Sequence, residues 1–385
     1  MNTNFFQGGI FKIVAVHSNK VLDIDASNNG SNLSKDGTKL QQWGWLNRAN
    51  QKFMVFPTDD VGRYFVIASI ASGKVLDIPD SGKYEGAEVI QRAFTGNDTQ
   101  LFELEKVPNK PDTYLIRSKQ SGRVLNVSGV RTDDSAPILE YSLSISGAQA
   151  GNIQFKFEKV AELKDSAKSV IQEVLDQSPA LPSFEFPALS SPQKPQSTRE
   201  WRMVGKPFLL PYFMVQDNNS YWQVNESPYY LLTREVCYTL NDEYFTYNNT
   251  NSEQEYEVTV VAGFTTEEST SFSRNTGLEI SGTIEHKVGA EAGAEVGVAS
   301  AKVSTETSIS FTATASLDLG YSTSTALSRH GETAIRRLVK CPAYTSLAVW
   351  SQTSKFTLSR VDKTILKRWE VPEGGIFIDD FKIPQ

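Results

Sequence analysis

The stretch Ala71–Asp77 reads ASGKVLD, and close copies of it begin at His17 (HSNKVLD) and Gln120 (QSGRVLN). The copies recur about every 50 residues along the first 160 residues. Each is followed by a segment that closes on a phenylalanine, namely Phe53, Phe102 or Phe155. Short β-type runs with Gly, Asn, Asp and Ser turns between them make up each unit. Three such units predict a closed, threefold β architecture.

Over residues 9–160 the pattern resembles the ricin-type β-trefoil lectin family. The Gln-x-Trp motif of that family appears here as Gln51-x-Phe53 and Gln100-x-Phe102, while Ile153 stands where the third glutamine would be. The resemblance implies that the aromatic residues and the leucines of the VLD motifs fill the trefoil core. It also implies that the glutamines tie backbone segments together.

Sugar binding in a shallow lectin pocket uses a carboxylate that accepts hydrogen bonds from hydroxyls, an aromatic platform and neighbouring amides. By resemblance, the first repeat has the whole set: Asp23, Gln41, Trp43, Asn50 and Gln51. We expect this to be the principal carbohydrate site. The alternative for Asp23 is a turn cap, because the sequence DIDASNNGSN around it is rich in loop residues.

The other two repeats carry reduced sets. The second repeat keeps Asp77 but has Ile90 and Arg92 where the first repeat has its amide and its platform, so we expect it to be the weakest site. Phe94 is a candidate substitute for Trp45 there. In the third repeat Asn126 replaces the acid and Tyr141 is the candidate platform.

The middle of the chain predicts a connection between domains. Residues 164–177, KDSAKSVIQEVLDQ, place Val170, Ile171, Val174 and Leu175 on one helical face, with Asp165 or Ser166 as N-cap. The following SPALPSFEFPALSSPQKPQ is dense in proline and predicts an extended linker. The predicted domains are therefore residues 1–160, a linker at 161–200 and a β-rich domain at 201–385.

The stretch 288–298, VGAEAGAEVGV, fits a helix or a strand when it is read alone. Extended to 278–298, its even positions are mostly apolar and its odd positions are Glu, Ser, Thr, Lys or Gly, which favours a strand. Beyond residues 299–302 the phase reverses up to residue 321, which predicts a hairpin at about 277–321. Its tip lies near 297–302 or earlier, around 289–293.

Each predicted arm is longer than the roughly 9–11 residues that a tilted strand needs to cross a bilayer. The residues expected to face lipid are Leu278, Ile280, Ile284, Val288, Ala292, Val296, Val298, Val303, Ile309 and Phe311. The Ser/Thr-rich flanks TTEESTSFSRNT and YSTSTALSR are predicted to be the strands that carry the hairpin. One hairpin leaves unpaired edges in lipid, so a pore requires several chains. The alternative is an ordinary sheet with one packed and one wet face.

Residues 206–238 carry a second resemblance, through the run VQDN followed by SPYYLLTR. This segment is similar to the start of the C-terminal domain of the Bin-like binary insecticidal crystal toxins. Those bacterial proteins join a ricin-type trefoil to an aerolysin-like pore-forming domain, and the domain order here is the same. The resemblance implies an all-β fold, a glycan or glycosylated receptor on the target cell and a membrane-bound self-oligomer. It also allows a second toxin component as a partner.

Composition and motifs exclude several other classes. The net charge of −7 argues against a nucleic-acid binder. No transmembrane helix or secretory signal is expected from the sequence. The resemblance implies a bacterial inclusion or crystal protein, or a released protein, that acts on target-cell membranes from outside. We expect no enzyme, cofactor or metal, because no catalytic or metal-binding motif is present. Cys237 and Cys341 are buried thiols or one disulfide. The rival function is a lectin with a β-rich accessory domain and no pore activity.

Overall fold

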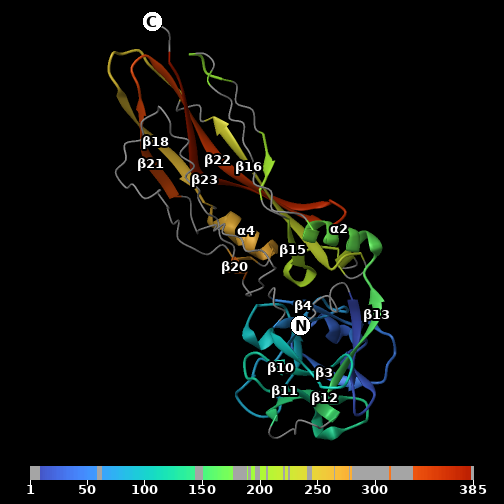
Figure 1. Ribbon diagram of the computed structural model, residues 1–385. Coiled ribbons are helices and arrows are strands. Elements are labelled where there is room, and N and C mark those ends of the chain that lie inside the picture. The colour runs from blue at the N-terminus through green and yellow to red at the C-terminus, as the bar shows by residue number, and fades with distance from the viewer. Residues whose placement is uncertain are drawn as a thin grey trace. The chain divides into compact units, whose positions relative to one another are not determined.

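The computed structural model describes most of the chain outside the predicted hairpin (Figure 1). The described residues are 9–58, 63–143, 151–176, 189, 192–195, 200–204, 207–219, 222–223, 226–240, 245–263, 265–276, 278–279, 312–313 and 333–382. They fall into two units. The first comprises Met1–Glu173, Leu209–Tyr230 and Ala313–Tyr321, and the second comprises Val174–Phe208, Leu231–Thr312 and Ser322–Gln385. Antiparallel strands dominate both units, which confirms the all-β class.

A closed ring of six strands forms the barrel of the first unit, drawn in blue to green in Figure 1. In ring order these are β1 (Gly9–Ala15), β4 (Phe53–Pro57), β5 (Phe65–Ser69), β9 (Phe102–Lys106), β10 (Thr113–Ser118) and β13 (Phe155–Glu162). Each strand pairs antiparallel with the next, and β13 pairs with β1 to close the ring. Because the ring is closed, each of the six strands pairs with a neighbour on both sides and the barrel has no unpaired edge strand.

Three hairpins extend the barrel, one for each sequence repeat. They are β2 (Lys20–Ile24) with β3 (Thr38–Trp43), β6 (Val75–Asp77) with β8 (Ile90–Arg92), and β11 (Val124–Val127) with β12 (Ala136–Tyr141). The short strand β7 (Ala87–Glu88) pairs with β12. Every hairpin begins at a VLD or VLN motif, and the threefold arrangement confirms the predicted β-trefoil.

The repeated apolar residues meet in one core. Phe53, Phe102 and Phe155 are fully buried in a single cluster, and so are the three leucines of the VLD and VLN motifs, Leu22, Leu76 and Leu125. Ile153 is also fully buried, as an apolar residue in the place of the missing glutamine. The predicted core of the trefoil is therefore confirmed.

Helix α2 (Asp165–Asp176) confirms the helix predicted after the trefoil. It buries Ala167 and Val174, while Val170 and Ile171 are half-buried. Most of the predicted proline-rich linker lies outside the described residues.

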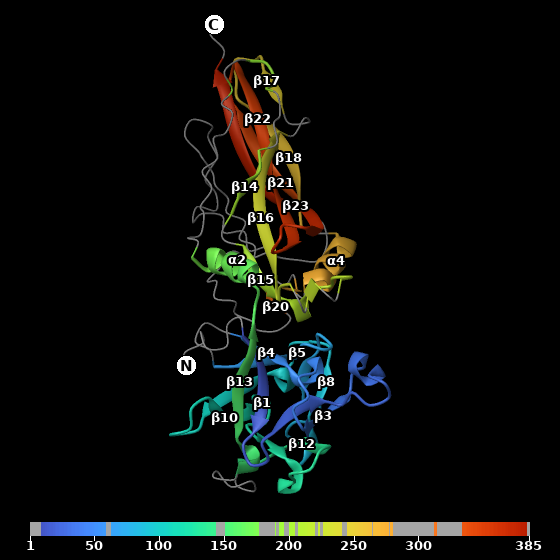
Figure 2. The ribbon, with the colours of Figure 1, turned by 90° about the vertical axis from the view of Figure 1, so that its right-hand side faces the viewer.

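A second sheet consists mainly of long antiparallel strands, most of which belong to the second unit. Its strands are β14 (Arg202–Met203), β15 (Phe208–Pro211), β16 (Tyr229–Leu240), β17 (Thr246–Asn248), β18 (Gln254–Ala262), β21 (Thr333–Cys341), β22 (Thr345–Arg360) and β23 (Ile365–Lys382). The order is β14-β16-β22-β23-β18-β21, with β15 beside β16 and β17 beside β22. Figure 2 shows β18, β21, β22 and β23 running side by side. The sheet buries two apolar clusters, around Val258 and Val349 and around Ala348 and Trp350.

Cys237 and Cys341 are both buried thiols and are not joined by a disulfide, so the thiol alternative is confirmed. Burial raises the pKa of the Cys341 thiol to about 11, which keeps the less reactive thiol form at neutral pH.

One predicted strand is wrong. The flank TTEESTSFSRNT forms helix α4 (Thr266–Thr276) instead of a strand that carries the hairpin. A capping box explains the difference: the backbone N–H of Glu268 donates to Thr265 Oγ1 at 3.2 Å, and the backbone N–H of Thr265 donates to Glu268 Oε2 at 3.1 Å. Burial of Phe272 against Phe356 then fixes the helix on the sheet. The capping box and the packing of Phe272 therefore favour a helix over the strand that the alternation predicts.

The predicted hairpin is mostly beyond the described residues. Of its expected lipid-facing residues only Leu278 is described, in β19 (Leu278–Glu279), and the other nine lie outside, as does the flank YSTSTALSR. β19 pairs with β20 (Thr312–Ala313) in a two-stranded sheet. Among the helices that the structure describes, none is both long and apolar enough to span a membrane.

Candidate carbohydrate-binding site

The hairpin of the first repeat brings the predicted site residues together. In the antiparallel register of β2 and β3, Asp23 lies opposite Gln41 and Val21 lies opposite Trp43. Residues two apart on a strand share a face, so the acid and the aromatic platform belong to one patch. The short helical turn Ala49–Gln51 supplies the two remaining amides.

Three amides hold the Asp23 carboxylate, which is only 5% exposed. Oδ2 accepts from Asn50 Nδ2 and Gln51 Nε2, both at 2.9 Å, and Oδ1 accepts from Gln41 Nε2 at 3.2 Å. A carboxylate has about four acceptor positions, so Oδ1 keeps one for a further donor. The site therefore has the chemistry to accept a hydrogen bond from a sugar hydroxyl.

Burial raises the pKa of Asp23 above its ordinary value. The hydrogen bonds from the three amides act in the opposite direction, and the nearby charge of Asp25 adds to the rise. Asp23 is thus a carboxylate whose charge is more easily lost in acid than that of an exposed aspartate.

Gln51 links the acid to the loop that follows the platform. Its Nε2 also donates to the Gly44 carbonyl at 2.8 Å, and its Oε1 accepts from the Leu46 N–H at 2.8 Å. Gln100 holds the matching loop of the second repeat, through the Ala93 carbonyl and the Thr95 N–H. These bonds confirm that the two glutamines tie backbone segments together, and they keep the loop beside Trp43 in one position.

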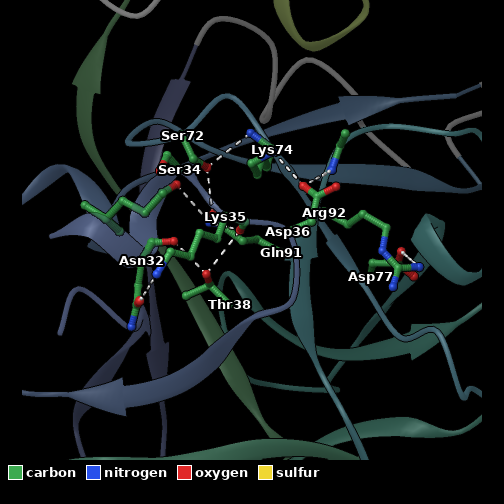
Figure 3. Close-up of polar contacts among 12 residues, drawn as sticks. Asn32, Ser34, Lys35, Asp36, Thr38, Ser72, Lys74, Asp77, Gln91 and Arg92 are labelled. Carbon is green, nitrogen blue, oxygen red and sulfur yellow. Dashed lines mark hydrogen bonds and ion pairs between the residues drawn. The ribbon is translucent and has the colours of Figure 1, made fainter. Parts of the chain in front are cut away.

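In the second repeat the acid is paired within the protein. Arg92 occupies the platform register, opposite Val75, and its Nη1 lies 3.3 Å from Asp77 Oδ2. The same oxygen accepts from Gln100 Nε2 at 3.3 Å, whereas Oδ1 meets no donor among the described residues. Figure 3 shows Arg92 extending toward Asp77. A guanidinium in place of an aromatic ring removes the stacking surface that a sugar needs.

The third repeat retains the platform but loses the charge. Tyr141 lies opposite Val124, in the register of Trp43, and Asn126 lies opposite Leu139. Asn126 is 7% exposed, and Asn152 Nδ2 donates to the Val127 carbonyl at 3.3 Å much as Asn50 does to that of Ile24. Without a carboxylate, any binding here depends on neutral hydrogen bonds, which are weaker than charged ones.

Sequence reasoning missed a set of buried polar residues that precede the platform residues. Gln42, Gln91 and Glu140 are fully buried, and in each repeat a serine hydroxyl donates to their side chain. The serines are Ser18, Ser72 and Ser121 of the three VLD-type motifs. The signal was visible, since a Gln or Glu comes directly before Trp43, Arg92 and Tyr141.

Each of these side chains is part of a clasp between neighbouring repeats. In the clasp drawn in Figure 3, Gln91 Nε2 donates to the carbonyls of Leu33 and Lys35 in the first repeat, and Lys74 Nζ lies 2.6 Å from Asp36 Oδ1. Gln42 reaches the carbonyls of Arg131 and Asp133 in the same way, beside the ion pair of Lys20 and Asp134. The clasps close the threefold ring through side chains as well as strands.

In the third clasp the hydrogen-bond roles are reversed, because the central side chain accepts from the neighbouring loop. Glu140 replaces glutamine, and it accepts from the Gly82 N–H at 2.7 Å and from the Ser81 and Ser121 hydroxyls at 2.9 Å. Arg123 Nη1 lies 3.7 Å away. The loop at residues 81–82 thus presents donors where the other two repeats present carbonyls.

Substitution of Glu140 with glutamine is expected to destabilise the trefoil by about 1–3 kcal/mol, because an amide nitrogen would then face a buried donor. Chemical unfolding measures the change, and Glu88→Gln, at a half-exposed carboxylate paired with Lys39, is the matched control. A Glu140→Gln protein as stable as the unsubstituted one would contradict this assignment.

A cluster of five aromatic rings covers one face of the second repeat. Phe213 lies 4.8 Å from Phe94 and 5.1 Å from Phe56 between ring centroids, and Tyr229 lies 5.5 Å from Phe56. Tyr212 donates its hydroxyl to the Ser69 carbonyl at 3.0 Å. The segment 209–230 of the first unit therefore covers Phe94, the residue predicted to substitute for Trp45.

A comparison of the three repeats explains why segment 209–230 packs on the second repeat. The counterparts of Phe56 in the other repeats are Glu158 and Glu105, each paired with a cation, Lys12 and Arg117 respectively. Desolvating such a pair under an aromatic segment costs free energy, whereas Phe56 gains from it. The face of the second repeat is thus used inside the protein, and the polar site of the first repeat is left free of this segment.

Trefoil and sheet together define a two-part, all-β protein, and comparisons with known proteins agree with this fold. A family model described as insecticidal crystal toxin P42 matches residues 202–378, and a ricin-type β-trefoil lectin domain-like model matches residues 4–62 and 56–141. The second half of the chain thus matches an insecticidal crystal toxin family and the first half a ricin-type lectin family, which confirms the resemblance of both segments.

One solved structure supports this fold over nearly the whole chain. Cry35Ab1 is 13% identical and has a TM-score of 0.63, over 97% of this chain and 90% of that one. The designed threefold symmetric protein ThreeFoil is 28% identical, with a TM-score of 0.35 over 40% of this chain and 99% of its own. The Macrolepiota procera ricin B-like lectin in complex with lactose is 16% identical, with a TM-score of 0.32 over 40% and 96%. A search of curated proteins gave no match.

Proposed function

We propose that this insecticidal toxin uses the first trefoil repeat to bind a glycan or glycosylated receptor on the target cell. The observation that carries the proposal is the buried Asp23 carboxylate, held by three amides with one acceptor position open, on the same strand face as Trp43. Asp23, Gln41 and Trp43 provide the binding surface, and the buried Asn50 and Gln51 complete the site by holding Asp23. Asp77 is paired with Arg92, and Asn126 with Tyr141 offers only a neutral, weaker site.

Glycan binding should weaken as the pH falls, and the loss should begin at a higher pH than it would for an exposed aspartate with an ordinary pKa. The ionised carboxylate accepts the sugar hydroxyl, and burial raises its pKa, so binding is full at neutral pH and falls as the pH drops through that raised pKa. Glycan-array signal measured from neutral pH to about pH 4 tests this. A signal that stays constant over that range would remove Asp23 from the site.

For the second unit we propose oligomerisation on the membrane and insertion of a β-hairpin from each chain into a shared barrel. The pairing of β19 with β20 supports this, because it brings together the two ends of the alternating stretch 280–311. Apolar and polar residues alternate along that stretch as a lipid face and a water-filled lumen require. Closure by several chains satisfies the backbone groups at the hairpin edges.

In this proposal the protein is made as a bacterial inclusion or crystal, or is released, and acts on target cells from outside, with a second toxin component as a potential partner. The proposal assigns it no catalytic step. Dye release from vesicles prepared from target-cell membranes tests the pore, and it also separates a toxin from a non-lytic lectin. A lectin would bind the vesicles and leave the dye inside.

A further inference from the structure

Helix α4 has a sequence that is poorly suited to a helix. Six of its eleven residues are Ser or Thr, one is Asn, and none is Ala or Leu. Two side chains near its end bond back to the helix: Asn275 Nδ2 to the Ser271 carbonyl and Thr276 Oγ1 to the Phe272 carbonyl. Such side chains compete with the backbone ladder and weaken a helix from within.

The same segment continues the strand alternation of β18 without a change of phase. In β18 the even positions face inward, with Val258 and Val260 buried, while Glu255 and Glu257 on the odd positions point outward. Through α4 the even positions include Thr270, Phe272 and Thr276, and the next is Leu278 of β19. The odd positions there are Ser269, Ser271, Ser273 and Asn275. Among the even positions from 268 to 278, only Glu268 and Arg274 carry a charge.

Contacts at its start and at Phe272 keep this segment helical. The capping box of Thr265 and Glu268 holds its start. The Phe272 ring lies 5.6 Å from Phe356 and 4.9 Å from Trp369 between centroids, and Trp369 Nε1 donates to Ser271 Oγ at 3.3 Å. Gly263 directly follows the last residue of β18 and has a φ of 105°. A glycine can leave that conformation for an extended one at little cost.

We propose that α4 is a helix-to-strand switch: on the membrane, residues 265–276 become extended and join β18 to the arm that begins at Leu278. The inference rests on the proposed pore function and adds to it the segment that lengthens the hairpin. Eleven residues rise about 1.5 Å each in a helix and about 3.3 Å each in a strand, a gain of about 20 Å. This is roughly two-thirds of the hydrocarbon thickness of a bilayer.

Two matched double variants of the full chain test the switch. Thr270→Ala with Asn275→Ala favours the helix, and Thr270→Val with Asn275→Val removes the same polar groups but favours a strand. We expect dye release by the alanine pair to be about tenfold slower than that of the unsubstituted protein, because the helix must be lost before insertion. The valine pair should release dye at least as fast as the unsubstituted protein. Glycan binding should be equal in all three, and far-UV circular dichroism verifies that each is folded.

Equal rates of release by the three proteins would overturn the switch and leave the pore proposal intact. Faster release by the alanine pair would overturn it as well. An unsubstituted protein that binds vesicles but releases no dye would instead overturn the pore proposal, and the switch with it.

Discussion

Replacing Asp23 with asparagine is expected to reduce glycan affinity by about 100-fold or more. Hydrogen bonds to an ionised acceptor contribute about 1.5–3 kcal/mol each, and a neutral amide is a weaker acceptor for the sugar hydroxyl. The new amide nitrogen would also face Asn50 or Gln51, which now donate to the carboxylate at 2.9 Å, and would disturb the pocket. Titration with the glycan that gives the strongest array signal measures the loss.

Asp77→Asn is the matched control for this experiment. Asp77 occupies the same strand position in the second repeat but is paired with Arg92, so its substitution should leave glycan affinity unchanged. If Asp77→Asn weakens binding and Asp23→Asn does not, the site belongs to the second repeat and the assignment made from the polar cluster is wrong.

Replacing Phe53 with alanine is expected to destabilise the trefoil by about 3–5 kcal/mol, a large fraction of the stability of a domain. The ring is fully buried in the threefold core, and its removal leaves a cavity that the closed barrel cannot fill by a small shift. Urea unfolding followed by loss of glycan binding reports on this unit.

Tyr84→Ala is the control, because Tyr84 is 53% exposed and its truncation should change stability by no more than about 0.5 kcal/mol. A Phe53→Ala protein that unfolds at the same urea concentration as Tyr84→Ala would contradict the position of Phe53 in the core.

The trefoil was predictable because its threefold repetition places the same residue type at the same structural position. Phe53, Phe102 and Phe155 all close a repeat, and all three meet in the core. The register of the hairpins also followed from the sequence, since the VLD motifs align Trp43, Arg92 and Tyr141 opposite equivalent valines.

Features that depend on distant parts of the chain were not predictable. Phe213 covers Phe94 across more than one hundred residues of sequence, and no local pattern indicates that contact. The clasp of Gln91 with the Leu33 and Lys35 carbonyls likewise joins residues that lie far apart in sequence. The strand prediction for residues 265–276 was wrong for a different reason. The alternation there predicts a strand, but the capping box and the packing of Phe272 stabilise helix α4 instead.

The matches to both family models were predictable, because two short segments and the order of the domains carried the resemblance. All five residues of the first candidate site were named from the sequence by resemblance. The structure was needed to show that three of them, the amides, donate to the one carboxylate of Asp23. The hairpin stays a prediction, since 280–311 lies outside the described residues.

The central claim is that this chain binds a glycan through its trefoil and then opens a membrane. Dye release from vesicles prepared from target-cell membranes tests it most directly, with the unsubstituted protein compared with Asp23→Asn. The account predicts release that depends on protein concentration with an order above one, and much slower release by Asp23→Asn. Vesicles that bind the unsubstituted protein and retain their dye, at every pH tested and after protease treatment, would contradict it.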